Sequence, residues 1–308
     1  MLAIFLKTLP FFALIGTGWL AGRLRFFPED ATAWLTRFVF YFALSAMLFR
    51  VSATLDLAAL FDLRFVLAYL AGSVVVWALV FAIAWRSGAP VVEAAMLAHT
   101  GMIGNTGFLG VPMLVVLLGP SAIGPVLMVL TLDLVVFSTL INLIIAAARH
   151  GRVGIGTLLP VARGIVGNPM IVSMVAGLAW SAFRLPMPEP AAEFLTLLGG
   201  AATPGALFAI GASLSYRPMR RPVPALGLSF AKLVLHPLAV GLAAMLLAVD
   251  PVAAGVMVAA AALPVAGNVY ILAHHFGIAQ ERVSAAILIS TAISIATIPY
   301  VIHLIPKG

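Results

Sequence analysis

Residues 91–119 read VVEAAMLAHTGMIGNTGFLGVPMLVVLLG, a run that is long and apolar enough to cross a membrane but carries glycine, asparagine and proline at its centre. Gly104, Asn105, Gly107 and Gly110 weaken a helix there, and Pro112 removes a backbone donor where lipid offers no replacement. A membrane protein tolerates such a break only where protein or a water-filled cavity surrounds it. The stretch therefore predicts a membrane helix that is broken at mid-depth for a functional reason.

Composition places the whole chain in a membrane. Of its 308 residues, 63% are hydrophobic and only 9% are charged, against about 25% in soluble domains. Long apolar runs recur, so we predict an all-α, multi-pass protein in a lipid bilayer, with residues 4–22 retained as a helix and not removed as a signal peptide. The absence of cysteine excludes disulfides and thiolate metal sites, and we expect no metal site. The net charge of +7 comes mostly from arginines in short connections, which argues against nucleic-acid binding.

Applying a span of about 20 residues predicts ten transmembrane helices joined by short connections with turn signals such as RLRFFPED and RLPMPEP. The predicted helices cover residues 4–22, 33–50, 63–85, 91–118, 122–147, 160–183, 194–215, 224–248, 252–275 and 283–305.

The distribution of basic residues predicts the orientation of these helices. Twelve of the 17 lysines and arginines lie in or beside the odd-numbered connections. The positive-inside rule then places these connections in the cytoplasm and both termini outside, in a bacterial cytoplasmic (inner) membrane.

The two halves of the chain resemble each other. Residues 18–25 (GWLAGRLR) and 177–184 (GLAWSAFR) align at a fixed offset, and Gly-Asn dipeptides recur at 104–105 and 267–268. Five helices per half reverse the orientation of the second half. We therefore infer two inverted five-helix repeats, residues 1–150 and 151–308.

The second half breaks its fourth helix in the same way as the first. Its sequence AALPVAGNVYILAHH carries Pro264, Gly267 and Asn268 near its middle. Matched interruptions are the best sequence indication of a transporter's binding site, although kinks also serve helix packing. In inverted repeats the half-helices beginning near Asn105 and Asn268 enter from opposite faces, so their positive dipole ends converge at the midplane and attract an anion.

Other polar residues in apolar helices have both functional and structural interpretations. Asp133 could bind H⁺ or Na⁺ and couple its movement to the substrate, or pair with a neighbouring helix. His99 could carry protons or hydrogen-bond a carbonyl. Ser45 and Thr203 occupy similar places in the two repeats, where they contact substrate or serve packing. Lys232 is expected to extend to the cytoplasmic surface.

The stretches GNTGFLGVP, LPVAGNVYILA and GNPMIVSMVAGLAW, with the ten-span plan, resemble the auxin efflux carrier family in its compact bacterial form. The resemblance implies a fold similar to bile-acid symporters and sodium/proton antiporters, with broken, crossing helices 4 and 9. Helices 1, 2, 6 and 7 would form a scaffold, and helices 3–5 and 8–10 a transport domain. Asn105 and Pro112 match the first crossing element, while Pro264 and Asn268 match the second.

Bacterial members of that family are commonly described as malonate, malate or other small-carboxylate permeases. We therefore predict a secondary transporter that moves a small organic anion, malonate-like, malate-like or auxin-like, by alternating access at the midplane. The predicted substrate site comprises Asn105, Thr106, Gly107, Pro112, Pro264, Gly267, Asn268, Ser45 and Thr203, with Asp133 and His99 as ion-coupling residues.

Several alternatives remain open at this stage. One is a sodium-coupled organic-anion symporter of similar fold, and another is a ligand-binding channel or sensor. We find no HExxH, GxSxG, P-loop or GxGxxG motif, so no enzymatic activity, catalytic residue or cofactor is expected beyond a coupling H⁺ or Na⁺. Uniport, the direction of transport and a homodimer also stay open.

Overall fold

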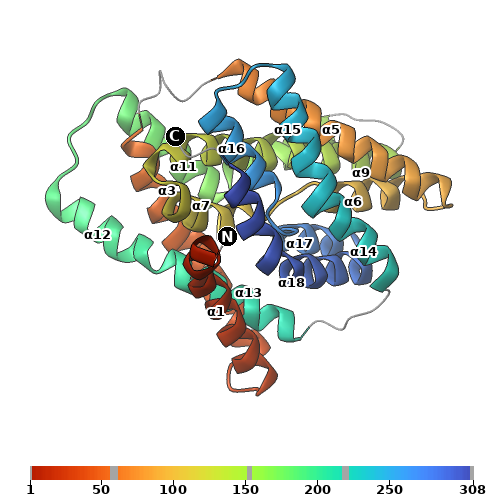
Figure 1. Cartoon of the computed structure of the whole chain (residues 1–308), viewed down its shortest axis with the longest axis horizontal. Coiled ribbons are helices and arrows are strands. Elements are labelled where there is room, and N and C mark those ends of the chain that lie inside the picture. The colour runs from red at the N-terminus through yellow and green to blue at the C-terminus, as the bar shows by residue number, and fades with distance from the viewer. Residues whose placement is uncertain (1, 56–61, 151–154, 217–221, 306–308) are drawn as a thin grey trace.

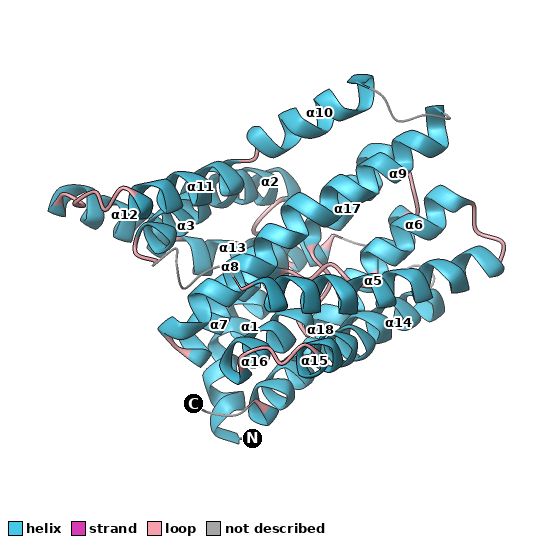
Figure 2. Ribbon diagram, turned by 90° about the horizontal axis from the view of Figure 1, so that it is seen from above, coloured by secondary structure: helices cyan, strands magenta, loops and turns pink. Residues whose placement is uncertain are grey.

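The computed structural model describes residues 2–55, 62–150, 155–216 and 222–305, and each regular element in these ranges is a helix (Figure 1, Figure 2). Within the described ranges, seven helical stretches are long and apolar enough to cross a membrane. Large apolar side chains on the outside of these helices, such as Leu197 and Val223, are more than 70% exposed. A lipid bilayer covers such side chains, so the chain is a multi-pass membrane protein.

The helices follow one another in the order shown in Figure 1. Their bounds are α1 Leu2–Arg23, α2 Glu29–Phe38, α3 Leu44–Ala53, α5 Leu63–Arg86, α6 Val91–Thr100, α7 Val111–Leu118, α8 Ile123–Thr131, α9 Ser138–His150, α10 Ile155–Val166, α11 Pro169–Ala182, α12 Glu189–Gly200, α13 Ala202–Ser215, α14 Pro222–Phe230, α15 His236–Leu246, α16 Pro251–Ala261, α17 Gly267–Phe276 and α18 Gln280–Leu304. Short wider or tighter turns connect some of them: the π-helical segments η1 Val39–Ala43, η2 Thr106–Gly110, η4 Leu132–Phe137 and η5 Ala231–Leu235, and the 3₁₀ turn η3 Pro120–Ala122.

Two predicted single helices are divided in the structure. The helix expected over residues 194–215 is α12 and α13, which meet at Ala201. The single helix expected over residues 160–183 is instead α10 and α11, separated at Gly167 and Asn168. Pro169 explains the separation, because proline fits the first turn of a helix but disfavours helical backbone at the residue before it.

The helices pack in two groups. We call α1, α2, η1, α3, α11, α12 and α13 the panel, because α1 packs along α13, and α3 packs against α11 and α12. We call α5 to α9 and α14 to α18, with η2 to η5, the crossover bundle, in which α5 packs on α15 and α6, and α14 on α18. Figure 1 shows α3, α11 and α12 on one side of the molecule and α5, α6, α9 and α14 on the other.

Glycines allow close contacts between helices within each group. A Cβ atom on Gly211 of α13 would collide with the backbone carbonyl of Ile15 on α1, and one on Gly72 of α5 would collide with the backbone of Val240 on α15. Small residues of this kind give membrane helices their van der Waals contact, because lipid supplies no hydrophobic drive for helices to associate.

Two interrupted helices cross inside the bundle. The first interruption separates α6 from η2, and the second separates α16 from α17. The two non-helical segments pair as an antiparallel bridge between Gly104 and Val265, where Asn105 N–H donates to the Pro264 carbonyl (2.9 Å) and Ala266 N–H donates to the Ile103 carbonyl (3.1 Å). Each break therefore satisfies backbone groups that the other has freed, which is what the interior of a membrane requires.

Candidate functional site

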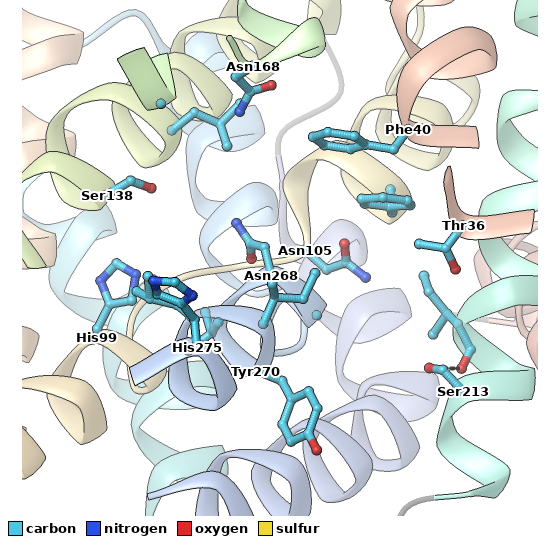
Figure 3. Close-up of a pocket in the computed structure, with 18 of the residues that line it drawn as sticks. Thr36, Phe40, His99, Asn105, Ser138, Asn168, Ser213, Asn268, Tyr270 and His275 are labelled. Carbon is cyan, nitrogen blue, oxygen red and sulfur yellow. Dashed lines mark hydrogen bonds between the residues drawn. The ribbon is translucent and has the colours of Figure 1, made fainter. Parts of the chain in front are cut away.

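A cavity of about 1380 Å³ lies between the panel and the crossover bundle (Figure 3). On the panel side it is lined by Thr36, Phe40, Asn168, Ile210 and Ser213, among others. On the bundle side it is lined by His99, Asn105, Phe108, Ser138, Asn142, Asn268 and Tyr270, among others. The two groups thus enclose a space with a mixed lining of amides, hydroxyls and aromatic rings.

The cavity reaches the end of the molecule that carries the odd-numbered connections. Glu29, Tyr216, Gln280 and Glu281 line it, and each lies at a helix end beside such a connection. Arg37 also lines this part, with its guanidinium over the Trp34 ring at 4.8 Å from the ring centroid.

Asn105 and Asn268 stand at the starts of the second halves of the two broken helices. Asn105 precedes η2, which continues into α7, and Gly267 and Asn268 open α17. Asn105 is only 6% exposed, and no described residue forms a hydrogen bond with its side-chain amide. Figure 3 shows both amides at the same opening. The structure thus brings these two predicted residues together at one cavity.

Other predicted substrate contacts near the crossing lie outside the cavity lining. Thr106, Gly107 and Pro112 are buried in η2 and α7, and Pro264 is buried in the second break. A Cβ on Gly107 would lie 2.7 Å from the Cε atom of Met170, so this glycine permits close approach of the bundle to the panel. Pro112 does not end a helix: it lies where the wider π-helical segment η2 continues into α7.

Ser45 and Thr203 also lie outside the cavity lining. The Ser45 hydroxyl donates to the Phe40 carbonyl (3.2 Å), five residues earlier. The Ser138 hydroxyl makes the same contact with the Asp133 carbonyl (3.0 Å). These serines supply hydrogen bonds to carbonyls in the π-helical segments η1 and η4, a structural role that the sequence pattern did not indicate. Thr203 is half-buried in α13.

Asp133 is buried, 5% exposed, in η4 beside the first break. The Tyr69 hydroxyl donates to one carboxylate oxygen (2.7 Å), and the Thr106 hydroxyl donates to the other (3.2 Å). Burial of a carboxylate in an apolar protein is expensive unless such donors or a cation compensate it.

Lys232 is also completely buried, so the expectation that it reaches the cytoplasmic surface is wrong. Its Nζ atom donates to the carbonyl of Ala261, the last residue of α16, and lies 3.2 Å from His236 Nδ1. The other ring nitrogen of His236 is 2.9 Å from the Ser73 hydroxyl. An ammonium at the C-terminal end of α16 meets the negative end of the helix dipole.

These contacts form one buried polar network between the two breaks. Hydrogen bonds lead from Thr106 at the first break to Asp133 and on to Tyr69. The Tyr69 ring packs beside the His236 ring, with centroids 5.8 Å apart. His236 in turn contacts Lys232, which binds the Ala261 carbonyl at the second break. The network can hold charge or a proton beside the crossing without direct exposure to the cavity. His99, 3% exposed, lines the cavity itself.

Within the described ranges, no three histidine or acidic side chains lie close enough together to bind a metal ion.

Asn168 is a cavity residue that the site prediction missed. The sequence did contain an indication of it, because a third Gly-Asn dipeptide lies at 167–168. We interpreted that dipeptide only as part of a family motif. Lys232 had a signal as well, because it lies eight residues into the predicted span 224–248, or about 12 Å along a helix.

Comparison with known proteins gives two matches. A family model described as "Membrane transport protein" matches residues 3–154 and 157–302. A protein of Rhizobium meliloti (strain 1021) named "Putative malonate transporter" is 36% identical over 304 residues, which cover 97% of this chain and 95% of that protein.

Proposed function

Because the chain belongs to the membrane transport protein family, as its motifs indicated, we propose that it is a secondary carrier of a small organic anion. It is a transporter and not an enzyme. The name of the Rhizobium relative makes malonate the first substrate to test.

The observation that carries the proposal is the position of Asn105. Asn105 is only 6% exposed, no described residue hydrogen-bonds its side-chain amide, and it faces a cavity that Asn268 also lines. Because the amide opens into the cavity, its N–H donors are available to a carboxylate of the substrate. The N-terminal ends of the helices that follow Asn105 and Gly267 add positive partial charge at the same place.

The place of the cavity between two helix groups supports alternating access as the mechanism. We propose ten spans in two inverted repeats, in which α6–η2–α7 and α16–α17 are the broken fourth and ninth helices. The panel acts as the scaffold, and the crossover bundle slides against it and carries the anion. If the arginine-rich odd connections are cytoplasmic, the present conformation is open to the cytoplasm, and contacts of α7 with α1 and α13 close the other side.

Asp133 is the proposed coupling residue. Its carboxylate contacts Thr106 at the first break, so gain or loss of H⁺ or Na⁺ there changes a hydrogen bond next to the substrate site.

Counterflow in proteoliposomes tests this function. Purified protein is reconstituted with internal malonate, and entry of labelled external malonate is followed. We expect saturable, counterflow-stimulated uptake that Asn105→Ala and Asn268→Ala each reduce, with affinity lower by about tenfold. Flux without counterflow would indicate a channel, and binding without flux a sensor. Strict dependence on Na⁺ would favour a sodium symporter.

A further inference from the structure

The cavity has an amide on its panel side as well as those at the crossing. We propose that Asn168 is a further substrate-binding residue, whose side-chain N–H groups contact the anion from the panel while Asn105 and Asn268 contact it from the crossover bundle. This inference rests on the proposed function.

Local backbone structure fixes the direction of the Asn168 amide. Asn168 is the N-cap of the 14-residue helix α11, with Pro169 at the first helical position. Its Oδ1 atom accepts from Met170 N–H (3.0 Å). Since the oxygen is held by the helix, the Nδ2 donors point away from it. No described residue accepts from Nδ2, and Asn168 lines the cavity (Figure 3).

The choice of asparagine at this cap is informative. Side-chain caps also occur at Asp62, before α5, and at Asp250, before α16 and its Pro251. Asparagine and aspartate cap equally well, and the helix dipole favours the carboxylate. Neither aspartate lines the cavity, whereas Asn168 does. An aspartate at 168 would cap α11 but would replace the Nδ2 donors with a charged oxygen that repels an anion beside it; the carboxylates that already line the cavity, Glu29 and Glu281, lie at helix ends beside the odd-numbered connections.

The panel position gives Asn168 a role distinct from that of the crossing residues. Helix α11 packs against α3 and η1 of the panel, so Asn168 stays in place when the bundle moves. The panel and the crossover bundle therefore hold the anion together only while the cavity is open at the end that carries the odd-numbered connections. Asn105, a residue only 6% exposed, independently directs an amide without a protein partner among the described residues into the same cavity, which indicates that a polar ligand belongs there.

Malonate binding to the purified full chain, measured by calorimetry, tests the proposal with two cap-preserving substitutions. We expect Asn168→Asp to weaken malonate affinity at least about tenfold with an unchanged melting temperature. The matched control Asp250→Asn should alter neither quantity. Wild-type affinity in Asn168→Asp would overturn the role of Asn168 alone. Absence of carboxylate binding by the wild-type protein would overturn the proposed function together with it.

A second measurement does not depend on the folding of Asn168→Asp. Because the chain has no cysteine, Asn168→Cys introduces a single thiol. We expect malonate to slow the reaction of this thiol with a negatively charged methanethiosulfonate at least about threefold. When malonate occupies about two-thirds of the sites, only the remaining third of the protein can react. The thiol of Asp250→Cys should react at the same rate with or without malonate. Equal reaction rates for Asn168→Cys with and without malonate would overturn the proposal.

Discussion

Replacement of Lys232 by methionine tests the buried network most severely. Methionine has a similar length and no charge, so it fills most of the space but removes the ammonium. The Ala261 carbonyl and the His236 ring then lose their contacts with Nζ, and each unsatisfied buried group costs about 1–3 kcal/mol. Asp133, which is connected to Lys232 through Tyr69 and His236, also loses a nearby cation, and this adds to the loss. Since these costs overlap, we expect a loss of about 3–5 kcal/mol in the free energy of unfolding.

Unfolding in detergent, followed by tryptophan fluorescence, measures this loss. The matched control is Lys7→Met, because Lys7 is exposed and its substitution should have little effect. In the double variant Lys232→Met with Asp133→Asn, both formal charges are absent, so its loss should be smaller than the sum of the single losses by about 1–3 kcal/mol. Wild-type stability of Lys232→Met, or strictly additive losses, would refute the network as described.

Three further substitutions have expected outcomes. Ser290→Ala removes the hydroxyl that accepts from Val265 N–H (3.1 Å) in the second break, and should lower unfolding free energy by about 1–3 kcal/mol in the same detergent assay; no change would mean that water or another group replaces it. Gly211→Leu should prevent α1 from packing on α13, with loss of folded protein in size-exclusion chromatography, while Gly16→Ala, which meets no atom within 4 Å, should be tolerated. Asp133→Asn should retain malonate counterflow but lose ion-driven accumulation in proteoliposomes; intact accumulation would make the residue structural.

The breaks in the helices were predictable because glycine, proline and asparagine occur together at the middle of two apolar runs. Their effect is local, and it depends little on which helix lies alongside. The structure has interruptions at residues 101–105 and 262–266, which contain Gly104, Asn105 and Pro264.

The buried network was less predictable, because it depends on which helices become neighbours. Tyr69, Asp133 and Lys232 lie on three separate helical segments, and only packing brings them together. The π-helical turns were also unexpected, since they arise where the helix adapts to its surroundings and have no simple sequence signal. For the same reason the sequence left Ser45 open between substrate contact and packing and did not indicate its hydrogen bond to the Phe40 carbonyl.

Movement of the crossover bundle against the panel is the central claim, and a reversible cross-link between them tests it directly. Phe40 on the panel and Phe108 on the bundle have ring centroids 6.3 Å apart, and the chain has no cysteine of its own. A short bis-methanethiosulfonate across Phe40→Cys and Phe108→Cys should stop malonate counterflow, and reduction should restore it. The control is a cross-link within the panel. Phe27, just after α1, and Phe208 on α13 have ring centroids 5.1 Å apart, and the same reagent across Phe27→Cys and Phe208→Cys should leave counterflow intact. Undiminished counterflow in the protein cross-linked between residues 40 and 108 would contradict the sliding mechanism.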